Sequence, residues 1–112
     1  MRFLILLPIL AVVACGKATP PELSSDAALR FTEANELLAT MTAKEARGTL
    51  GTVSKTTARA LVDAEALMID ECRKHPDAKV GERTLRQVLE DASGYSFGVG
   101  EKLAAVAAAD CR

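Results

Sequence analysis

From Ser24 onwards, apolar residues recur at steps of three and four along almost the whole chain. This spacing puts them on one face of an α-helix, whereas a half-buried strand would alternate with a period of two. No run of the sequence alternates for long enough to predict a strand. Few aromatic residues and many alanines also suit closely packed helices. The sequence therefore predicts an all-α domain over residues 24–112.

Glycine and proline residues divide this pattern into four predicted helices. The first begins at Ser24 or Ser25, with Asp26 in its first turn, and ends at Gly48 and Gly51. The second stops at "KHP" because Pro76 disfavours helical geometry at the residue before it. The third runs from about 77 to 92, and the last follows the "GYSFGVG" segment, 94–100. Their expected inward-facing residues are Ala27, Phe31, Ala34, Leu38 and Met41; Val53, Thr57, Ala60, Ala64, Leu67, Met68 and Cys72; Leu85, Val88, Leu89 and Ala92; and Val99, Leu103, Val106 and Asp110.

The first residues have a different character. Arg2 is followed by "FLILLPILAVVA", which carries no charge and is too short to cross a membrane, since a spanning helix needs about 20 apolar residues. A short basic start, an apolar run and a small residue before the cut are typical of an export signal. A buried N-terminal core helix is the alternative, but this run has no polar face.

The end of this run, "Val12-Val13-Ala14-Cys15", resembles the lipobox of bacterial lipoproteins. The resemblance implies that residues 1–14 are removed and that Cys15 carries a diacylglyceryl group and an acylated N-terminus. Gly16 follows the cysteine, which by the same resemblance favours the outer membrane over the inner one. "GKATPPEL", 16–23, then reads as an extended tether, because Pro20 and Pro21 disfavour helix; an ordered arm packed on the domain is the alternative.

If Cys15 is lipidated, Cys72 and Cys111 are the two remaining thiols in an oxidising compartment, where pairing is the default. The apolar spacing from 85 to 106 also permits one helix of about 30 residues, or about 45 Å, which would keep the two thiols apart. Glycines at 94, 98 and 100 are costly inside a helix and favour a break there. We therefore expect a Cys72–Cys111 disulfide in a small antiparallel four-helix bundle.

The mature chain offers little that predicts catalysis. Removal of Arg2 leaves 14 − 1 = 13 Lys and Arg against 15 Asp and Glu, without a basic patch for nucleic acid. His75 reads as a surface cap, and the two cysteines lack zinc spacing. "GTLGTVSKTT", 48–57, lacks the order of a phosphate loop and reads as an interhelical loop. The acidic residues of "DAEALMIDE", 63–71, fall on different helix faces and read as solvated surface. We expect no enzyme activity, cofactor, metal or small-molecule substrate.

The "GYSFGVG" segment is the best candidate for a contact site. Tyr95 and Phe97 are two of very few aromatic residues in the mature chain, and the glycines beside them allow a partner backbone to approach. The alternative is that Tyr95 fills the core at a turn. On this basis Tyr95 and Phe97 are predicted to bind a partner.

A second resemblance rests on Cys72, Pro76, Asp77 and Cys111, in "ALMIDECRKHPDA" and near the end of the chain. The region 60–111 resembles the helical pilotins of type II secretion, outer-membrane lipoproteins that carry a secretin subunit by gripping its C-terminal segment. This implies a periplasm-facing lipoprotein that binds an envelope protein. A protective lipoprotein, acting in immunity or entry exclusion, and a structural envelope lipoprotein are the alternatives.

Overall fold

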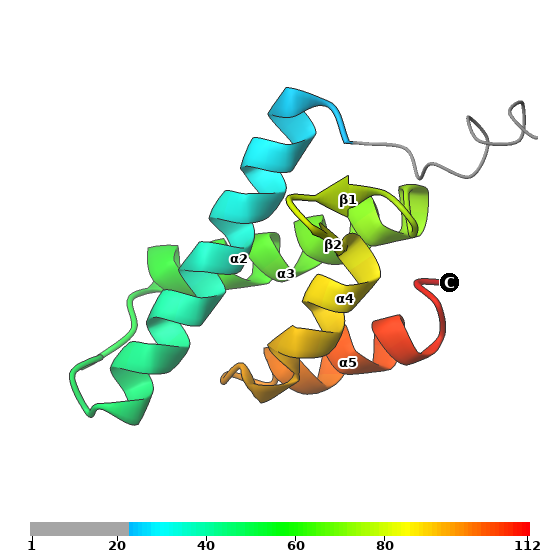
Figure 1. Cartoon of the computed structure of the whole chain (residues 1–112). Helices are drawn as coiled ribbons and strands as arrows, with labels where there is room; N and C mark the ends of the chain where they lie inside the picture. The colour runs from blue at the N-terminus through cyan, green and yellow to red at the C-terminus, as the bar shows by residue number, and fades with distance from the viewer. Residues whose placement is uncertain (1–22) are drawn as a thin grey trace, which may run out of the picture.

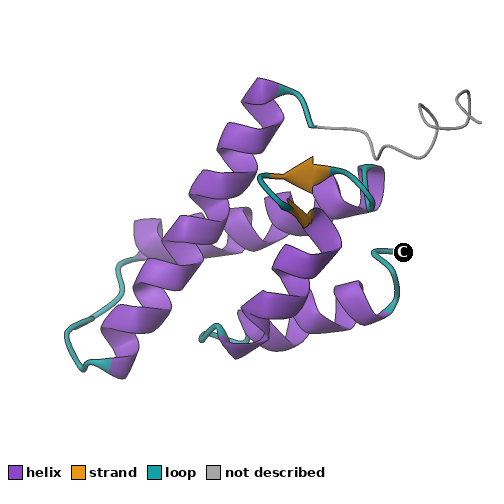
Figure 2. Ribbon diagram, in the orientation of Figure 1, coloured by secondary structure: helices purple, strands orange, loops and turns teal. Residues whose placement is uncertain are grey.

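The computed structural model describes residues 23–112, so the predicted signal peptide and Cys15 lie outside the described residues. Helices account for most of the described chain, and the helical prediction is confirmed at that level. The described helices are α2 (Ser25–Ala46), α3 (Lys55–Lys74), α4 (Leu85–Asp91) and α5 (Val99–Ala108). Figures 1 and 2 show that α2 crosses α3 obliquely, while α4 and α5 pack on α3 from another side. The fold thus consists of two helical hairpins, α2–α3 and α4–α5, with α3 packed against both helices of the second hairpin, and a regular four-helix bundle is not confirmed.

Helix α2 spans Ser25–Ala46 and begins and ends as the sequence predicts. The Ser24 side chain accepts a hydrogen bond from the backbone N–H of Ala27, which satisfies one free donor of the first turn. At the other end Gly48 adopts a left-handed φ of 73°, and the N–H groups of Gly48 and Thr49 bond back to the last turn. The residues that α2 buries are Ala27, Phe31, Ala34, Leu38 and Met41, and this prediction is confirmed.

Helix α3 spans Lys55–Lys74, with Ser54 as its N-cap and His75 as its C-cap. His75 is exposed, and Pro76 follows it, so the helix stops where the sequence predicts. The buried face is shifted from the predicted one and includes Leu61 and Glu71, because α3 is covered by α2 on one side and by α4 and α5 on another. Several residues predicted to face inward are only partly buried, namely Val53, Thr57, Ala60 and Leu67.

The predicted third helix starts later than expected. Residues Lys79–Val80 (β1) and Arg83–Thr84 (β2) form a short antiparallel hairpin, with Gly81 at a φ of 69° in the turn. Helix α4, Leu85–Asp91, begins only after Thr84, whose side chain and backbone exchange hydrogen bonds with Gln87 in a capping box. This local capping moves the helix start eight residues beyond 77.

The break between the last two helices is confirmed. The 3₁₀ turn η1, Ala92–Gly94, ends the α4 segment, and α5 spans Val99–Ala108. Tightly buried side chains from all four helices meet in the core; the largest are Phe31, Leu38, Met68, Leu85, Leu89 and Leu103. Leu23, at the end of the predicted tether, also packs against this core.

The disulfide between Cys72 and Cys111 closes the fold. The two Cα atoms lie 5.6 Å apart, and both side chains are buried, as the sequence predicts. Asp110 and Cys111 adopt left-handed φ values of 55° and 59°, which turn the chain from the end of α5 back towards α3. Arg86 supports this end by pairing with Asp110 at 2.9 Å. The bridge therefore ties the last residues to the end of the central helix.

Candidate functional site

The segment 94–100 forms a tight turn whose shape depends on glycine. Gly98 has a φ of 74°, a conformation that side chains with a Cβ disfavour. Gly100 is buried, and a Cβ at this position would lie 2.3 Å from the carbonyl oxygen of Ser93 and 2.6 Å from that of Tyr95. The backbone of η1 therefore passes too close to α5 for any other residue to fit at 100 without movement.

Two hydrogen bonds hold this turn against α2. The Tyr95 hydroxyl donates to the Oδ1 atom of Asn35 at 2.6 Å, and the backbone N–H of Ser96 donates to the hydroxyl oxygen of Thr42 at 2.9 Å. Tyr95 is half-buried and packs against the core, and this burial raises the pKa of its hydroxyl. Tyr95 therefore helps to fix the turn, while any contact it makes with a partner stays a prediction.

Phe97 is presented differently from Tyr95. It is 38% exposed and has a φ of 67°, although it is not glycine. A residue with a Cβ in this conformation costs about 1–2 kcal/mol, and such strain persists only where the surrounding structure imposes it. Here the conformation of Phe97 is imposed by the hydrogen bonds of Tyr95 and Ser96 on one side and by Gly98 and Gly100 on the other. The turn thus holds an aromatic side chain at the surface.

Beside Phe97 lies a mainly apolar groove of about 460 Å³, which we call the Phe97 groove. One wall comes from α3 and the residue before its cap, and the other comes from the turn and the start of α5. Val62, on the α3 wall, is 59% exposed. Together with Phe97 it places two exposed apolar side chains at one groove, and contiguous exposed apolar surface is typical of interaction sites. The lining residues are Val53, Ala58, Leu61, Val62, Glu65, Phe97, Gly98, Val99 and Lys102.

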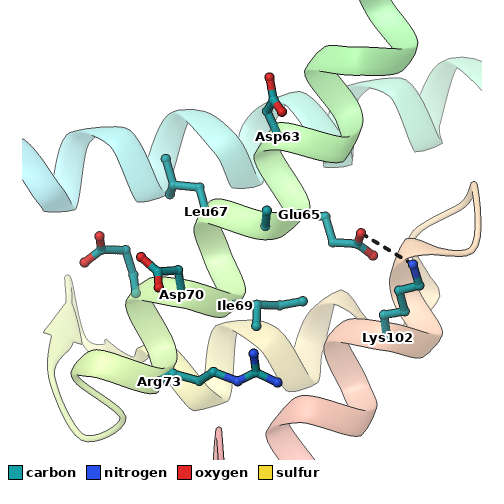
Figure 3. Close-up of a pocket in the computed structure, with 9 residues that line it drawn as sticks. Asp63, Glu65, Leu67, Ile69, Asp70, Arg73 and Lys102 are labelled. Carbon is teal, nitrogen blue, oxygen red and sulfur yellow. Dashed lines mark ion pairs between the residues drawn. The ribbon is translucent and has the colours of Figure 1, made fainter.

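One ion pair bridges the two walls of the Phe97 groove. The Lys102 Nζ atom lies 3.8 Å from the Oε1 atom of Glu65, as the dashed line in Figure 3 marks. The Glu65 side chain is only 12% exposed, whereas the Lys102 side chain is 70% exposed. The carboxylate therefore lies largely buried at the groove, while the exposed Lys102 ammonium stays available to another acceptor.

A second, shallower depression of about 740 Å³ lies along the later part of α3. Figure 3 shows that Leu67 and Asp70 point to one side of α3, while Glu65 and Ile69 point to the other, towards α5. The charged residues that line this depression have both signs. The sequence predicts that Glu71 is solvated, but it is buried, with only 9% of its surface exposed. Within residues 23–112, no group of three or more His, Cys, Asp or Glu side chains could hold a metal ion.

The remaining sequence candidates have simple positions. Residues 48–54 form the loop before α3, and the end of the "GTLGTVSKTT" segment forms the first turn of that helix. No helix among residues 23–112 combines the length and the apolar character needed to span a bilayer. The sequence singled out Phe97 as a candidate but not Val62, because a valine at a helical spacing carries no sign of its exposure.

Comparison of the chain with protein-family models, with characterised proteins and with solved structures finds no match. We therefore infer the function from the Phe97 groove and the turn beside it.

Proposed function

We propose that this chain is a lipid-anchored, non-enzymatic lipoprotein of the bacterial envelope that binds a protein partner in the Phe97 groove. The observation that carries the proposal is Phe97 itself, an aromatic side chain held at the surface in a left-handed conformation next to exposed Val62. Strained residues cluster at binding sites, where the strain positions a group before the partner arrives. Aromatic residues at the centre of an apolar patch are also typical binding hot spots.

The lining residues favour binding over catalysis. Valine, alanine, leucine and phenylalanine side chains supply contact area but no nucleophile, and the two charged lining residues, Glu65 and Lys102, are paired with each other. Burying an exposed phenylalanine and valine contributes about 25 cal/mol for each Å² of apolar surface removed from water. In this proposal the groove is a binding surface for a partner and not an active site.

The proposed location rests on the sequence. The lipobox-like residues before Cys15 favour an anchor in the outer membrane, with the domain facing the periplasm. Several acyl chains at one site hold a protein stably at a bilayer, because each buried methylene contributes about 0.8 kcal/mol. The pilotin-like form of the proposal makes the partner a secretin subunit. A protective or structural envelope lipoprotein would present the same anchor to a different partner.

In-cell photo-crosslinking tests the proposal. A photoreactive amino acid is placed singly at Val62, at Phe97 and, as a matched control, at Leu29, which lies on α2 and is 58% exposed. We expect positions 62 and 97 to trap the same envelope protein and position 29 to leave it uncaptured. A secretin subunit would support the pilotin-like form, and an incoming toxin would support the protective one. Equal capture from all three positions, or capture from none, would contradict a partner site at this groove.

A further inference from the structure

The charges around the Phe97 groove indicate which kind of partner it accepts. We infer that the groove takes an amphipathic helix of a protein partner, with acidic residues flanking the apolar stripe of that helix. This inference rests on the proposed function and adds the chemistry of the partner to it.

Three cations border the groove. Lys102 lines it from α5, with its side chain 70% exposed. Lys55 precedes Ala58 by three residues and Arg59 precedes Val62 by three, so both exposed cations lie beside the apolar wall of α3. The chain as a whole has a formal net charge of −1, so this border is positive on a slightly acidic protein.

The nearby carboxylates do not cancel this charge. Glu65 is the acidic lining residue, and its side chain is paired with Lys102 and 12% exposed. Asp63 lies four residues after Arg59 and lines the depression between α2 and α3 and the one along later α3, but it is not a lining residue of the Phe97 groove, and within residues 23–112 no ion pair joins it to Arg59. Glu101 lies in the first turn of α5 and is absent from the lining residues. Lys55 and Arg59, at the border of the groove, can therefore pair with acidic groups of a partner.

The starts of two helices add to the same polarity. Val53 and Ser54 precede α3, and Gly98 precedes α5, so both N-terminal ends lie at the groove. The first turn of α3 contains no acidic residue. The N-terminal end of a helix carries a partial positive charge, which favours carboxylates nearby.

The shape favours a helix over a small ligand or a strand. Val62 and Phe97 are 59% and 38% exposed, so a small molecule between them would stay largely in water, whereas small-ligand pockets bury about 70–90% of their ligands. The walls are side chains of α3, of the turn and of α5, so an added strand would find no edge to pair with there. An apolar helix face laid between the walls would cover both residues.

Binding of three synthetic helical peptides tests this inference. The peptides share one leucine stripe and carry glutamate, glutamine or lysine at the flanking positions. Their affinities are measured by fluorescence anisotropy for the lipidated protein in nanodiscs of zwitterionic lipid. We expect the glutamate peptide to bind at least about tenfold more tightly than the lysine peptide at low salt, with the ratio shrinking as salt is raised. Lys55→Glu with Arg59→Glu should remove or invert the preference.

Matched controls separate this inference from the proposed function. Lys79→Glu makes one of the same charge changes on the β1–β2 hairpin, which lies away from the orange turn before α5 in Figure 1 and contributes no lining residue to the groove, and it should leave the preference intact. Phe97→Asp should weaken all three peptides. Equal affinities that still depend on Phe97 would overturn the acidic partner and leave the groove proposal standing.

Three further outcomes would overturn the inference. They are a preference for the lysine peptide, failure of every peptide to bind, and Phe97-dependent binding to phosphatidylglycerol vesicles in place of peptides. Peptide binding that ignores Phe97→Asp would instead count against the proposed function.

Discussion

The hydroxyl of Tyr95 donates a hydrogen bond of 2.6 Å to Oδ1 of Asn35, which lies 60 residues earlier in the chain. This bond joins the turn before α5 to the middle of α2. Together with the bond from Ser96 to Thr42, it positions Phe97 relative to the rest of the fold. The candidate groove therefore depends on polar contacts that lie outside it.

Tyr95→Phe should destabilise the protein by about 0.5–1.5 kcal/mol, because it removes the donor and leaves the Asn35 oxygen part-buried without it. Chemical denaturation followed by circular dichroism measures this change. Asn35→Ala and the double variant complete a cycle, and a coupling energy near zero would show that the bond contributes nothing to stability.

The ionisation of Tyr95 should be shifted upwards. Burial raises the pKa of its hydroxyl above the ordinary value of 10.0, so the folded state holds the proton more tightly than the unfolded state. Stability is then full below pH 10 and is lost as pH rises through the folded pKa. Tyr95 is the single tyrosine in a chain without tryptophan, so absorbance near the phenolate band reports it directly. An identical titration in the folded and the denaturant-unfolded protein would contradict the shift.

Gly100→Ala should destabilise the protein by at least about 2 kcal/mol, since the new Cβ meets backbone atoms of η1 that cannot move independently. Gly94→Ala is the matched control, because among the described residues a Cβ at 94 meets nothing within 4 Å. Thermal unfolding of both variants compares them. Equal melting temperatures would mean that α5 and η1 do not approach each other as closely as the structure has them.

Phe97→Gly and Phe97→Ala separate strain from contact. Both remove the aromatic ring, but only alanine keeps the cost of a Cβ at a φ of 67°, so the glycine variant should be more stable by about 1 kcal/mol. Both should lose capture of the partner. If alanine is as stable as glycine in denaturant unfolding, Phe97 is not held in a strained conformation.

Cys15→Ser should abolish the membrane anchor that the lipobox-like sequence predicts. We expect an exported protein that is either unprocessed or no longer retained in the membrane fraction, because serine lacks the thiol that takes the lipid. Cell fractionation with intact-mass measurement tests this. A variant with unchanged mass and unchanged fractionation would refute the anchor.

The sequence by itself determined the helical character of the domain and many of its helix ends. Apolar residues at steps of three and four identified the whole buried face of α2, and Ser24, Pro76 and the glycines at 94–100 marked ends and breaks. These signals are local, since capping and backbone preference act within one turn. The two cysteines, with that break, correctly predicted how the last helix returns to α3.

The tertiary structure decided what local signals could not. The hairpin at 79–84 is the exception, because the prediction of a helix from about 77 overlooked two local signals: Gly81 turns the chain, and the Thr84–Gln87 capping box starts α4 later. The shifted buried face of α3 and the exposure of Val62 follow from which helices cover α3, and a sequence period carries no such information. The different positions of Tyr95 and Phe97, two residues apart, likewise arise because Asn35 and Thr42 of a distant helix hold the turn and leave the phenylalanine outside.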